Sequence, residues 1–323
     1  MTSSNSPEFP DPFESEFEED DIFRAFSRFV QIHIAQGDAT DDTIRAYYRE
    51  IDFWTQWCQR HNVDVANARR IHIEMYREEM KQQGLRINTR SHKLSIVRRF
   101  YDSAVEAGLR DNNPAAGVRG GKDQTPGEEK IKSLTGAALS RLLGVIPTDT
   151  LVGKRDRAIV ALMAIHGLRR VEIERMDEDS LLIQEDMVSI EVKGKANRIR
   201  QVYLRPDTYR VITDYLMHKH EAGFVAEGPC FVSLSNRSRG QRISRRSLNE
   251  IVDYYLSEAS LKRVGVSCHA LRHTFGTLSI SGGAKVEDLK NAMGHVEIES
   301  TELYVKAVAR VENNPANFID VEA

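Results

Sequence analysis

The chain has 323 residues, 41% of them hydrophobic and 29% charged, and its 45 Lys and Arg residues against 48 Asp and Glu give a formal net charge of −3. This composition predicts a globular protein long enough for about two domains, and the charge taken alone argues against a nucleic-acid protein, whose domains are usually basic. No apolar run approaches the roughly 20 residues of a membrane helix, and the acidic start of the chain is unlike a signal peptide, so we expect a cytoplasmic protein with no membrane partner. The three cysteines lie apart and form no C-x-x-C pair, so neither a zinc site nor a disulfide framework is expected.

The charge is unevenly distributed along the chain. Residues 1–21 hold eight acidic residues and neither Lys nor Arg, so residues 22–323 carry a net charge of +5, from 45 basic against 40 acidic residues. The first segment is also rich in Ser and Pro and can bury little apolar surface, which predicts an acidic disordered tail. The net charge therefore averages an acidic tail and a mildly basic body.

Helical periodicity begins directly after this tail. Apolar residues fall at helical spacing from Ile22 onward, and again after a possible cap at Asp41. Two further helices are expected over about 71–82 and 88–107. Residues 22–114 therefore predict a small all-helical domain.

A change of composition marks the end of this domain. Asn113-Pro114 is followed by a stretch rich in Gly, Pro and charged residues, in which no apolar period survives. Residues 115–131 are therefore the expected linker, and residues 132–323 the second domain.

The second domain is expected to be mainly helical, with one small sheet. Apolar residues alternate from Val188 to Val192 and again at Val202 and Leu204, and the basic segment 193–197 between them predicts the turn of a β-hairpin. The predicted fold class is mainly α with a small antiparallel sheet. Helices are expected at about 136–144, 155–165, 207–220, 245–258, 270–281, 285–293 and 299–308.

Two segments concentrate basic residues. Residues 81–110 hold seven Lys and Arg against two acids, and residues 236–246 hold five arginines and no acid. Arginines on loops and helix starts bind phosphates and read guanine in the major groove, so the second segment favours nucleic acid, while the first fits a solvated helix face equally well. The residues expected to contact a nucleic acid are Arg86, Arg90, Lys93, Arg98, Arg99, Arg237, Arg239, Arg242, Arg245 and Arg246.

The strongest local signal is the segment Cys268–Phe275, which reads C-H-A-L-R-H-T-F. His269 and Arg272 are three residues apart, so on a helix they share a face. Such a pair suits a phosphate, because the arginine neutralises charge and the histidine donates a hydrogen bond or moves a proton. Alone, this spacing is more commonly that of a surface His–Arg pair.

Other pieces stand before and after this segment. Gly167-Leu168-Arg169 follows an apolar helix, Gly294-His295 follows the H-x-x-R segment, and Tyr304 stands nine residues after His295. Each piece alone has a structural explanation: Gly167 as a helix C-cap, Arg169 as a salt-bridged surface residue and Tyr304 as a half-buried core tyrosine.

In this order, with a hairpin lysine in between, the motifs resemble those of the tyrosine recombinase (phage integrase) family. The resemblance covers about residues 22–310. The small helical domain resembles that family's SAM-like core-binding domain, which binds DNA, and Asn113-Pro114 with Leu134-Thr135 resembles its usual junction to the catalytic domain.

The resemblance implies the central chemistry. Tyr304 would be the nucleophile that attacks a DNA phosphate and forms a 3′-phosphotyrosine link. Arg169 and Arg272 would hold the non-bridging phosphate oxygens.

Other matched residues would assist this reaction. Lys195 at the hairpin tip would protonate the leaving oxygen, with Lys193 as the rival for that role. His269 would be the general base or a hydrogen-bonding group, and His295 the second histidine of the site. Glu172 would brace the site from behind.

The implied function is site-specific recombination of double-stranded DNA, in two rounds of strand exchange through a Holliday junction and with no metal, ATP or other cofactor. The protein would act as a homo-oligomer on DNA, a dimer on each site and a tetramer in synapsis, or with a related recombinase. Two alternatives stay open, a catalytically silent DNA-binding protein of the same fold and strand relaxation like that of a type IB topoisomerase.

The chain departs from the family pattern in a few places. His166 stands where Thr is usual, Arg170-Val171 where an aliphatic and then a small residue are usual, and Ala196 where a glycine is common. None removes a catalytic group, but they leave open whether this is a Xer-type resolvase or a mobile-element integrase. The acidic tail lies outside the shared pattern, and our hypothesis is that it restrains non-specific DNA binding or serves a partner.

Overall fold

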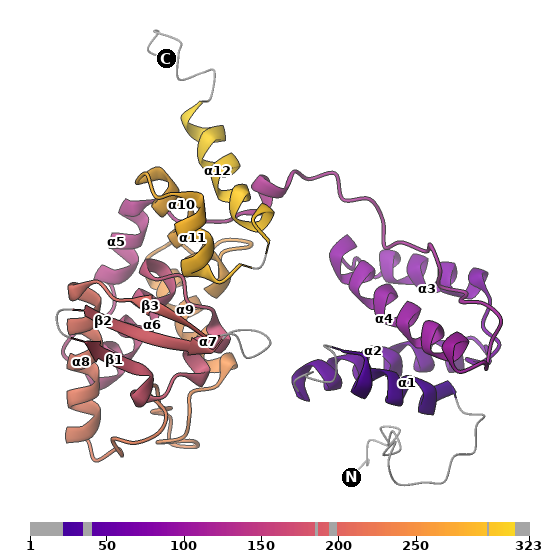
Figure 1. Cartoon of the computed structure of the whole chain (residues 1–323), viewed down its shortest axis with the longest axis horizontal. Helices are drawn as coiled ribbons and strands as arrows, with labels where there is room; N and C mark the ends of the chain where they lie inside the picture. The colour runs from indigo at the N-terminus through magenta and orange to yellow at the C-terminus, as the bar shows by residue number, and fades with distance from the viewer. Residues whose placement is uncertain (1–21, 35–40, 185–186, 194–198, 296, 314–323) are drawn as a thin grey trace. The chain divides into compact units, whose positions relative to one another are not determined.

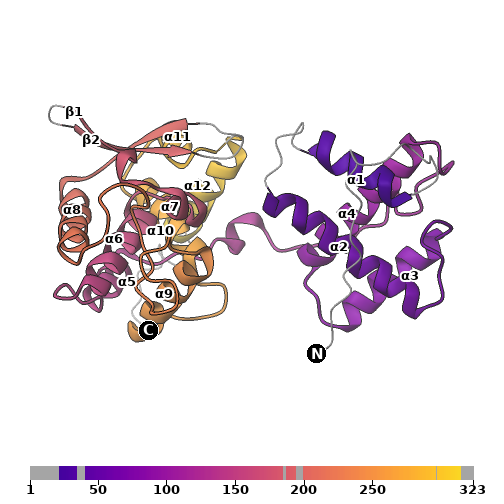
Figure 2. The same ribbon diagram turned by 90° about the horizontal axis from the view of Figure 1, so that it is seen from below.

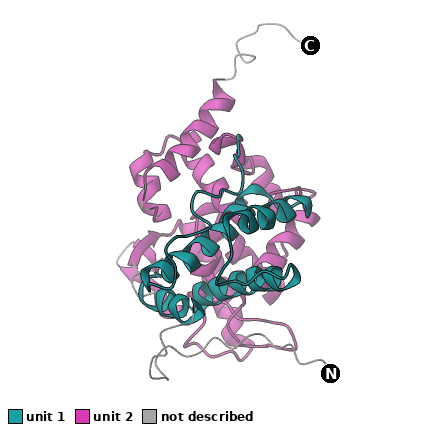
Figure 3. Cartoon of the chain, turned by 90° about the vertical axis from the view of Figure 1, so that its right-hand side faces the viewer, with its two compact units in different colours: residues 1–124 teal, residues 125–323 magenta. Residues whose placement is uncertain are grey.

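The computed structural model describes residues 22–34, 41–184, 187–193, 199–295 and 297–313. The chain divides between Gln124 and Thr125 into two compact units, which are coloured separately in Figure 3. This division falls inside the segment that the sequence predicts as a linker. The predicted acidic tail and the hairpin tip with Lys195 lie outside the described residues.

The first unit consists of helices (Figure 1). These helices bury an aromatic core. Trp54 and Trp57 stack with ring centroids 5.3 Å apart, and Trp54 Nε1 donates a hydrogen bond of 3.0 Å to the Tyr101 hydroxyl. Aromatic pairs of this kind add about 1 kcal/mol each beyond their buried area, which stabilises a unit of this small size. Its helices are α1 (Ile22–Ile32), α2 (Asp41–Arg60), α3 (Arg70–Gln82) and α4 (Ile87–Glu106).

The polypeptide that follows α4 is fixed against that helix. Ala115 and Val118 are buried in the core of the first unit. The Arg98 guanidinium donates to the carbonyl oxygens of both, at 3.3 and 2.8 Å. The first residues of the expected linker are therefore packed parts of the first unit.

Helix α6 (Leu151–Ile165) is the centre of the second unit. Its residues from Ala158 to Ala164 are all buried, and it packs against α8 (Pro206–Glu221) and α10 (Cys268–Ser281). Figure 2 shows the sheet at one edge of this unit and α9 (Arg245–Glu258) at the opposite edge. The remaining elements around them are α5 (Gly136–Gly144), α7 (Arg170–Arg175), α11 (Val286–Met293), α12 (Glu299–Glu312) and the 3-10 turns η2 (Gly127–Lys130) and η3 (Glu178–Ser180).

The sheet is antiparallel, in the order β1-β2-β3. Ile190 of β2 pairs with Val202 of β3, so the apolar residues of the predicted hairpin share the face that packs on the core. The expected fold class, mainly α with a small antiparallel sheet, is confirmed. The strands are β1 (Leu181–Gln184), β2 (Met187–Lys193) and β3 (Ile199–Tyr203).

Two short elements, α7 and β1, are not predicted by the sequence. Helix α7 has six residues and β1 has four, which is too few for a helical or alternating apolar period to stand out. Helix α7 matters for the site because it begins directly after Arg169.

The described parts of the chain contain no helix that is both long and apolar enough to cross a membrane. The cysteines are buried and form no disulfide bonds: Cys58, Cys230 and Cys268.

Candidate active site

One face of α10 carries the residues of the H-x-x-R-H motif. His269, Arg272, His273 and Gly276 occupy positions i, i+3, i+4 and i+7, which share one side of a helix. Helix α10 packs against α12, the helix that carries Tyr304. The two parts of the sequence signal are therefore brought together by one helix pair.

The Arg272 guanidinium is buried at this interface, with 2% of the residue exposed. It donates hydrogen bonds to the carbonyl oxygen of Gly167 and, at 2.6 Å, to that of Met293. Burial, and then the charge of Arg169, lower the pKa of Arg272 to about 9, so the group stays a cation at neutral pH. The turn at Gly167 and the end of α11 thus hold a buried positive charge in a fixed orientation.

Gly167 forms the turn that supplies one of these carbonyls. Its φ is +68°, and a Cβ atom there would lie 2.3 Å from the Phe275 ring, so a side chain would be strained and would clash. The Leu168 amide donates at 3.1 Å to the Leu162 carbonyl and closes the turn. Arg169 follows at once, which is how the G-L-R motif directs it into the site.

Glu172 connects Arg169 to the sheet. Its carboxylate accepts hydrogen bonds from the Arg169 backbone amide at 2.7 Å and from Arg169 Nη1 at 3.0 Å. Arg200 of β3 donates two more, at 2.8 and 2.9 Å. Bidentate pairing of this kind fixes direction as well as distance, so one buried carboxylate orients two guanidinium groups.

The charge on Glu172 is maintained by these contacts. Burial alone would raise the pKa of Glu172, but the hydrogen bonds and charge of Arg200, followed by the contacts with Arg169, hold it below its ordinary value. Arg169 Nη2 also donates to the Gly294 carbonyl at 3.2 Å, and 34% of the Arg169 side chain remains exposed. Arg169 is therefore held from behind and open to a ligand in front.

Tyr304 extends from α12 into the space left by Gly276. A Cβ atom on Gly276 would lie 2.7 to 2.8 Å from three atoms of the tyrosine ring, and 3% of Tyr304 is exposed. The Tyr304 hydroxyl is 3.0 Å from His273 Nδ1. Burial raises the pKa of Tyr304, and the charges of Arg272 and Arg169 offset part of that rise.

His295 lies beside the Tyr304 ring, with centroids 6.3 Å apart and ring planes 12° apart. Its Nδ1 is 2.8 Å from the Thr301 hydroxyl, so Nε2 is the ring nitrogen left for a ligand. Gly294, with φ at +61°, ends α11 in the left-handed conformation and turns the chain toward the site. Burial, and then the charge of Arg272, lower the pKa of His295 to about 4, so it is neutral at pH 7.

His269 lies at the exposed side of the same cluster. Its ring meets that of His273 edge-on, with centroids 4.4 Å apart. Loss of hydration, and then the charges of Arg272 and Arg169, lower the pKa of His269. The result is a neutral imidazole beside two cations.

The hairpin lysine cannot be placed in the same way, because Lys195 lies outside the described residues. Lys193 is the last residue of β2, is exposed, and pairs in register with Ile199 of β3. That Lys195, rather than Lys193, protonates the leaving oxygen stays a prediction.

Some residues of this cluster are not predicted by the sequence. Arg200 faces Val192 across the sheet, on the inward side of β3, and a basic residue at an inward position is a signal of a buried acidic partner. His273 is one helical turn after His269, so its place on the same face could have been read from the spacing. Thr301 carries no such signal, because its contact depends on how α11 and α12 meet.

The assembled cluster has an excess of positive charge. The guanidinium groups of Arg169 and Arg200 pair with the carboxylate of Glu172, and Arg272 adds a third positive charge that this carboxylate influences. This favours an anion with several oxygens, such as a phosphate. A tyrosine hydroxyl and neutral imidazoles beside that anion could supply a nucleophile and move protons. Within the described ranges, no group of His, Cys, Asp and Glu is arranged to hold a metal ion.

The expected DNA-contacting residues of the first unit differ in what they contact. Arg90 is buried and donates to two backbone carbonyls, as Arg98 also does. Lys93 forms an ion pair with a buried carboxylate. Arg86 and Arg99 are exposed. Three of the five therefore hold the unit together, and the two exposed arginines are the better placed to meet a phosphate.

The five arginines of the second unit are similarly divided. Arg242 donates to two carbonyls at the end of α7 and pairs with a carboxylate that follows them, and Arg245 pairs at 2.9 Å with an acid of α7. Arg246 pairs at 2.8 Å with an acid one turn along its own helix. Arg239 lies over an aromatic ring at 5.1 Å, and Arg237 is exposed. Arg242 and Arg245 thus fix this segment onto α7 and leave the others toward solvent.

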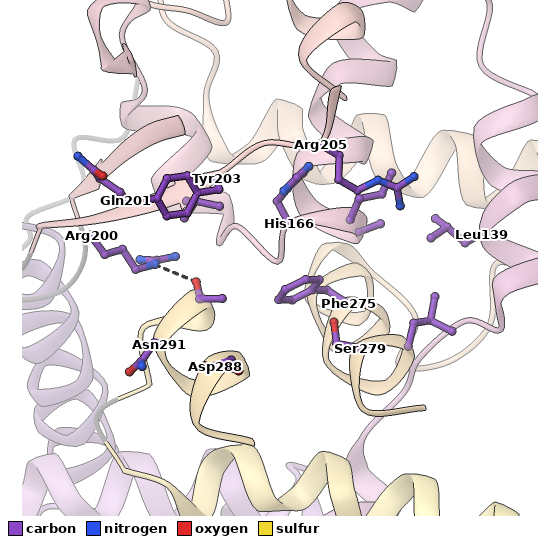
Figure 4. A pocket seen from close by; sticks show the side chains of 15 residues that line it. Leu139, His166, Arg200, Gln201, Tyr203, Arg205, Phe275, Ser279, Asp288 and Asn291 are labelled. Atoms are coloured by element: carbon purple, nitrogen blue, oxygen red, sulfur yellow. Dashed lines mark hydrogen bonds between the residues drawn. The ribbon is translucent and has the colours of Figure 1, made fainter. Parts of the chain in front are cut away.

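A cavity of about 800 Å³ lies beside this cluster, between β3, α10 and α11. Arg200 lines this cavity. As Figure 4 shows, it also donates a hydrogen bond of 3.0 Å to a backbone carbonyl of α11 that lies at the edge of the cavity. His166 also lines it. This residue is buried, its Nε2 has no hydrogen-bond partner among the described residues, and burial foremost lowers its pKa to about 4. Arg169, Arg272 and Tyr304 do not line this cavity, so it shares Arg200 with the charged cluster but does not include the tyrosine.

Comparison with known proteins gives matches over most of the chain. The model of the phage integrase family matches residues 132–310, and that of the N-terminal SAM-like domain of phage integrases matches residues 27–108. Tyrosine recombinase XerC of Pelobacter propionicus is 29% identical over 282 residues, which cover 86% of this chain and 89% of that protein. Tyrosine recombinase XerD of Caulobacter vibrioides is 26% identical over 279 residues, which cover 85% and 89%.

Solved structures show the same fold. The XerH site-specific recombinase bound to its palindromic difH substrate matches with a TM-score of 0.71 and 16% identity, over 90% of this chain and 84% of that one. The Tn1549 transposon integrase in complex with circular-intermediate DNA matches with a TM-score of 0.68 and 16% identity, over 91% and 99%.

Proposed function

The chain belongs to the phage integrase family, and from this premise we propose that it is a site-specific tyrosine recombinase that cuts and rejoins double-stranded DNA through a covalent bond to Tyr304. The observation that supports the chemistry most directly is the convergence of Arg169, Arg272 and Tyr304. These residues come from the turn before α7, from α10 and from α12, and they meet in one cluster with an excess of positive charge.

The proposed reaction begins when a DNA phosphate binds the two arginines. Arg169 and Arg272 bind its non-bridging oxygens and stabilise the charge that develops on five-coordinate phosphorus. The Tyr304 oxygen attacks the phosphorus, the bond to the 5′ oxygen breaks, and a 3′-phosphotyrosine and a free 5′-hydroxyl result. Because the new ester conserves the bond energy, a 5′-hydroxyl from another strand can reverse the attack without ATP.

The other matched residues would serve the oxygens of the phosphate. Lys195 would protonate the leaving 5′ oxygen, and His269 and His295 would hydrogen-bond the phosphate. Glu172 is buried behind Arg169 and would orient it rather than touch DNA. The arginines and the lysine would thus supply the positive charge that metal ions supply in other phosphoryl-transfer enzymes, and the neutral histidines would add hydrogen bonds.

We also propose a role for each part of the chain. Residues 22–114 would be the core-binding domain and residues 132–323 the catalytic domain, joined by residues 115–131 and acting on nucleoid DNA in the cytoplasm. Two rounds of exchange through a Holliday junction need two DNA sites, so a dimer on each site and a tetramer in synapsis are the proposed assembly. Both Xer recombinases and a transposon integrase are among the relatives, so chromosome resolution and mobile-element integration are both within this proposal.

The test is formation of a covalent protein–DNA adduct. Full-length protein would be incubated with nicked duplexes that have been selected from a random-sequence pool for binding to it. We expect an adduct that survives denaturation, that disappears in Tyr304→Phe and that falls at least about 100-fold in Arg169→Ala, as on removal of one oxyanion-stabilising donor.

Tyr254→Phe is the matched control, because Tyr254 is an exposed tyrosine of α9. An adduct that persists in Tyr304→Phe would show that the nucleophile is assigned wrongly. A wild-type protein that binds these duplexes and never forms an adduct would instead be a silent DNA-binding protein. An adduct that leads only to relaxation of supercoiled DNA, without exchange between sites, would favour the topoisomerase-like activity.

A further inference from the structure

The Tyr304 hydroxyl is hydrogen-bonded to a residue to which the family resemblance gives no role. His273 Nδ1 lies 3.0 Å from it, within ordinary hydrogen-bond distance. We propose that His273 accepts the phenolic proton when Tyr304 attacks the DNA phosphate. This inference rests on the proposed function, since it assigns a proton path to the same reaction.

The two neighbouring histidines are positioned to contact the phosphate rather than the Tyr304 hydroxyl. His295 has its Nδ1 occupied by the Thr301 hydroxyl, at 2.8 Å, and stacks beside the Tyr304 ring rather than at its hydroxyl. His269 is exposed, and the contacts described by the structure include no hydrogen bond from it to Tyr304. His269 and His295 therefore suit the phosphate oxygens, and the phenolic proton is left to His273.

Packing holds the pair of groups in place. Gly276 lies three residues after His273 on α10, and the Tyr304 ring fills the space above it. The rings of His273 and Tyr304 have their centroids 5.7 Å apart and are tilted by 55°. A general base must reach the proton that it removes before its pKa matters, and this geometry meets that requirement.

The charge of His273 is suitable for a proton acceptor. Facing it are Tyr304 from α12, His269 and Arg272 from α10, and His295 from the turn after α11. Burial, and then the influence of His269, Arg272 and His295, lower the pKa of His273 to about 4. The imidazole is therefore neutral at pH 7, with a lone pair available.

The low basicity of His273 also keeps the nucleophile inactive until DNA is bound. The pKa of Tyr304 lies above its ordinary value, so the resting hydroxyl keeps its proton. Transfer to His273 becomes favourable only as the tyrosine oxygen bonds to phosphorus, because bond formation makes the O–H far more acidic. Proton transfer and attack are thus expected to be coupled.

The attack transfers one proton to His273 and takes one from Lys195. A lone pair of the Tyr304 oxygen forms the bond to phosphorus, the O–H bond breaks and its proton passes to His273 Nδ1, and the electrons of the bond from phosphorus to the 5′ oxygen leave with that oxygen, which takes a proton from Lys195. On rejoining, the incoming 5′-hydroxyl returns its proton to Lys195. The departing tyrosine oxygen then recovers its own proton from the His273 imidazolium.

The first test needs no DNA. Because Nδ1 must accept, His273 must be the Nε2–H tautomer, and nitrogen NMR of the histidine-labelled full-length protein reads this directly. We expect the Nε2–H form, with a His273 Nδ1 signal that changes in Tyr304→Phe. An Nδ1–H tautomer would overturn the proposal, since the histidine would then donate to the tyrosine.

The second test is the pH dependence of single-turnover adduct formation, measured with the same selected nicked duplexes. His273→Asn is the informative variant, because its amide oxygen can still accept a hydrogen bond near the Nδ1 position but cannot take the proton. We expect its rate at neutral pH to fall about 100-fold, as for loss of a general base. We also expect its rate to keep rising through the alkaline range, where wild type has levelled off, because the pKa of Tyr304 lies above the ordinary tyrosine value of about 10.

His269→Asn is the matched control, one helical turn away on the same face. It is expected to slow adduct formation without this shift to alkaline pH, because His269 serves the phosphate. A His273→Asn protein with the wild-type rate and pH profile would overturn the inference and leave the recombinase assignment intact. A wild-type protein that forms no adduct would overturn the proposed function, and the tautomer would still decide whether His273 can accept the proton.

Discussion

Gly276 is the residue on which the position of the Tyr304 ring depends. Alanine is favoured over glycine inside a helix by about 1 kcal/mol, yet here a Cβ atom would lie 2.7 to 2.8 Å from the ring. Overpacking of this kind costs about 1–3 kcal/mol, and each 1.4 kcal/mol at the reacting geometry is about tenfold in rate. We predict that Gly276→Ala lowers single-turnover adduct formation at least about tenfold and leaves DNA affinity in a gel-shift assay unchanged.

Gly136→Ala is the comparison for this variant, because a Cβ atom at Gly136 meets nothing within 4 Å. Unaltered adduct formation in Gly276→Ala would mean that the tyrosine ring is not held where the structure places it.

The charge of Glu172 makes the stability of the folded protein depend on pH. Its pKa in the folded protein is held below its ordinary value, because the contacts with Arg200 and Arg169 outweigh the effect of burial. The ion cluster therefore stabilises the folded form above the unfolded-state pKa of about 4.3, and that stability is lost as the pH falls through the lower folded-state value.

We predict that Glu172→Gln lowers the free energy of unfolding of the second unit by on the order of 3 kcal/mol at pH 7, as on breaking a buried ion pair. The difference from wild type should narrow as the pH falls below about 4, which urea unfolding at both pH values measures. Glu250→Gln, at an exposed pair on α9, should change little at either pH. A Glu172→Gln difference that does not vary with pH would show that charge is not the cause.

At the scale of the elements, the long helices and the hairpin follow from apolar periodicity. The expected helices at 245–258 and 136–144 coincide with α9 and α5. Helix α7 and β1 are too short to carry a period. The contacts of Arg200 and His273 could not be predicted either, because each joins elements far apart in the sequence. The G-L-R and H-x-x-R-H motifs, by contrast, locate most of the site, since each motif lies within one turn or one helix face.

Counting the basic residues along α4 does not predict which of them are free to contact DNA. The sequence places Arg90 and Arg99 in one basic cluster, yet the fold buries Arg90 against the carbonyls of Leu85 and Gly120 and leaves Arg99 exposed. Periodicity shows that a helix forms, but whether an arginine on it faces a phosphate or a carbonyl depends on the chain that packs beside it.

Alanine substitutions of these two arginines are expected to have different effects. Arg90→Ala should lower the free energy of unfolding of the first unit by about 2 kcal/mol, because one buried and one partly buried carbonyl lose their donor. Arg99→Ala should leave unfolding unchanged, weaken DNA binding for all sequences, and reduce the slope of log affinity against log salt concentration by about 1. Thermal unfolding and binding titrations at several salt concentrations measure both. Equal destabilisation by the two substitutions would contradict the assignment.

At the scale of the whole molecule, the net charge of −3 does not describe the surface that meets DNA. Eight acids stand in residues 1–21, and the remainder carries +5. Several of its arginines are committed to carbonyls and carboxylates inside each unit. DNA binding must therefore depend on where the exposed cations lie rather than on the net charge, and it is expected to show a marked salt dependence.

The acidic tail is expected to oppose this binding. Deleting residues 1–20 should raise the affinity for non-specific DNA at low salt, and the gain should vanish at high salt, where charges are screened. Binding titrations of the full and shortened chains would measure this. An affinity that the deletion leaves unaltered would point to a protein partner as the role of the tail.

The proposed function depends on a covalent bond between Tyr304 and the 3′ end of a cut DNA strand. The most direct measurement is mass spectrometry of the denatured, nuclease- and protease-digested adduct, which identifies the modified peptide and the nucleotide end attached to it. We predict a nucleotide joined through its 3′ phosphate to the peptide that contains Tyr304, with a free 5′-hydroxyl on the released strand. An adduct on any other residue, or one through a 5′ phosphate, would contradict the account.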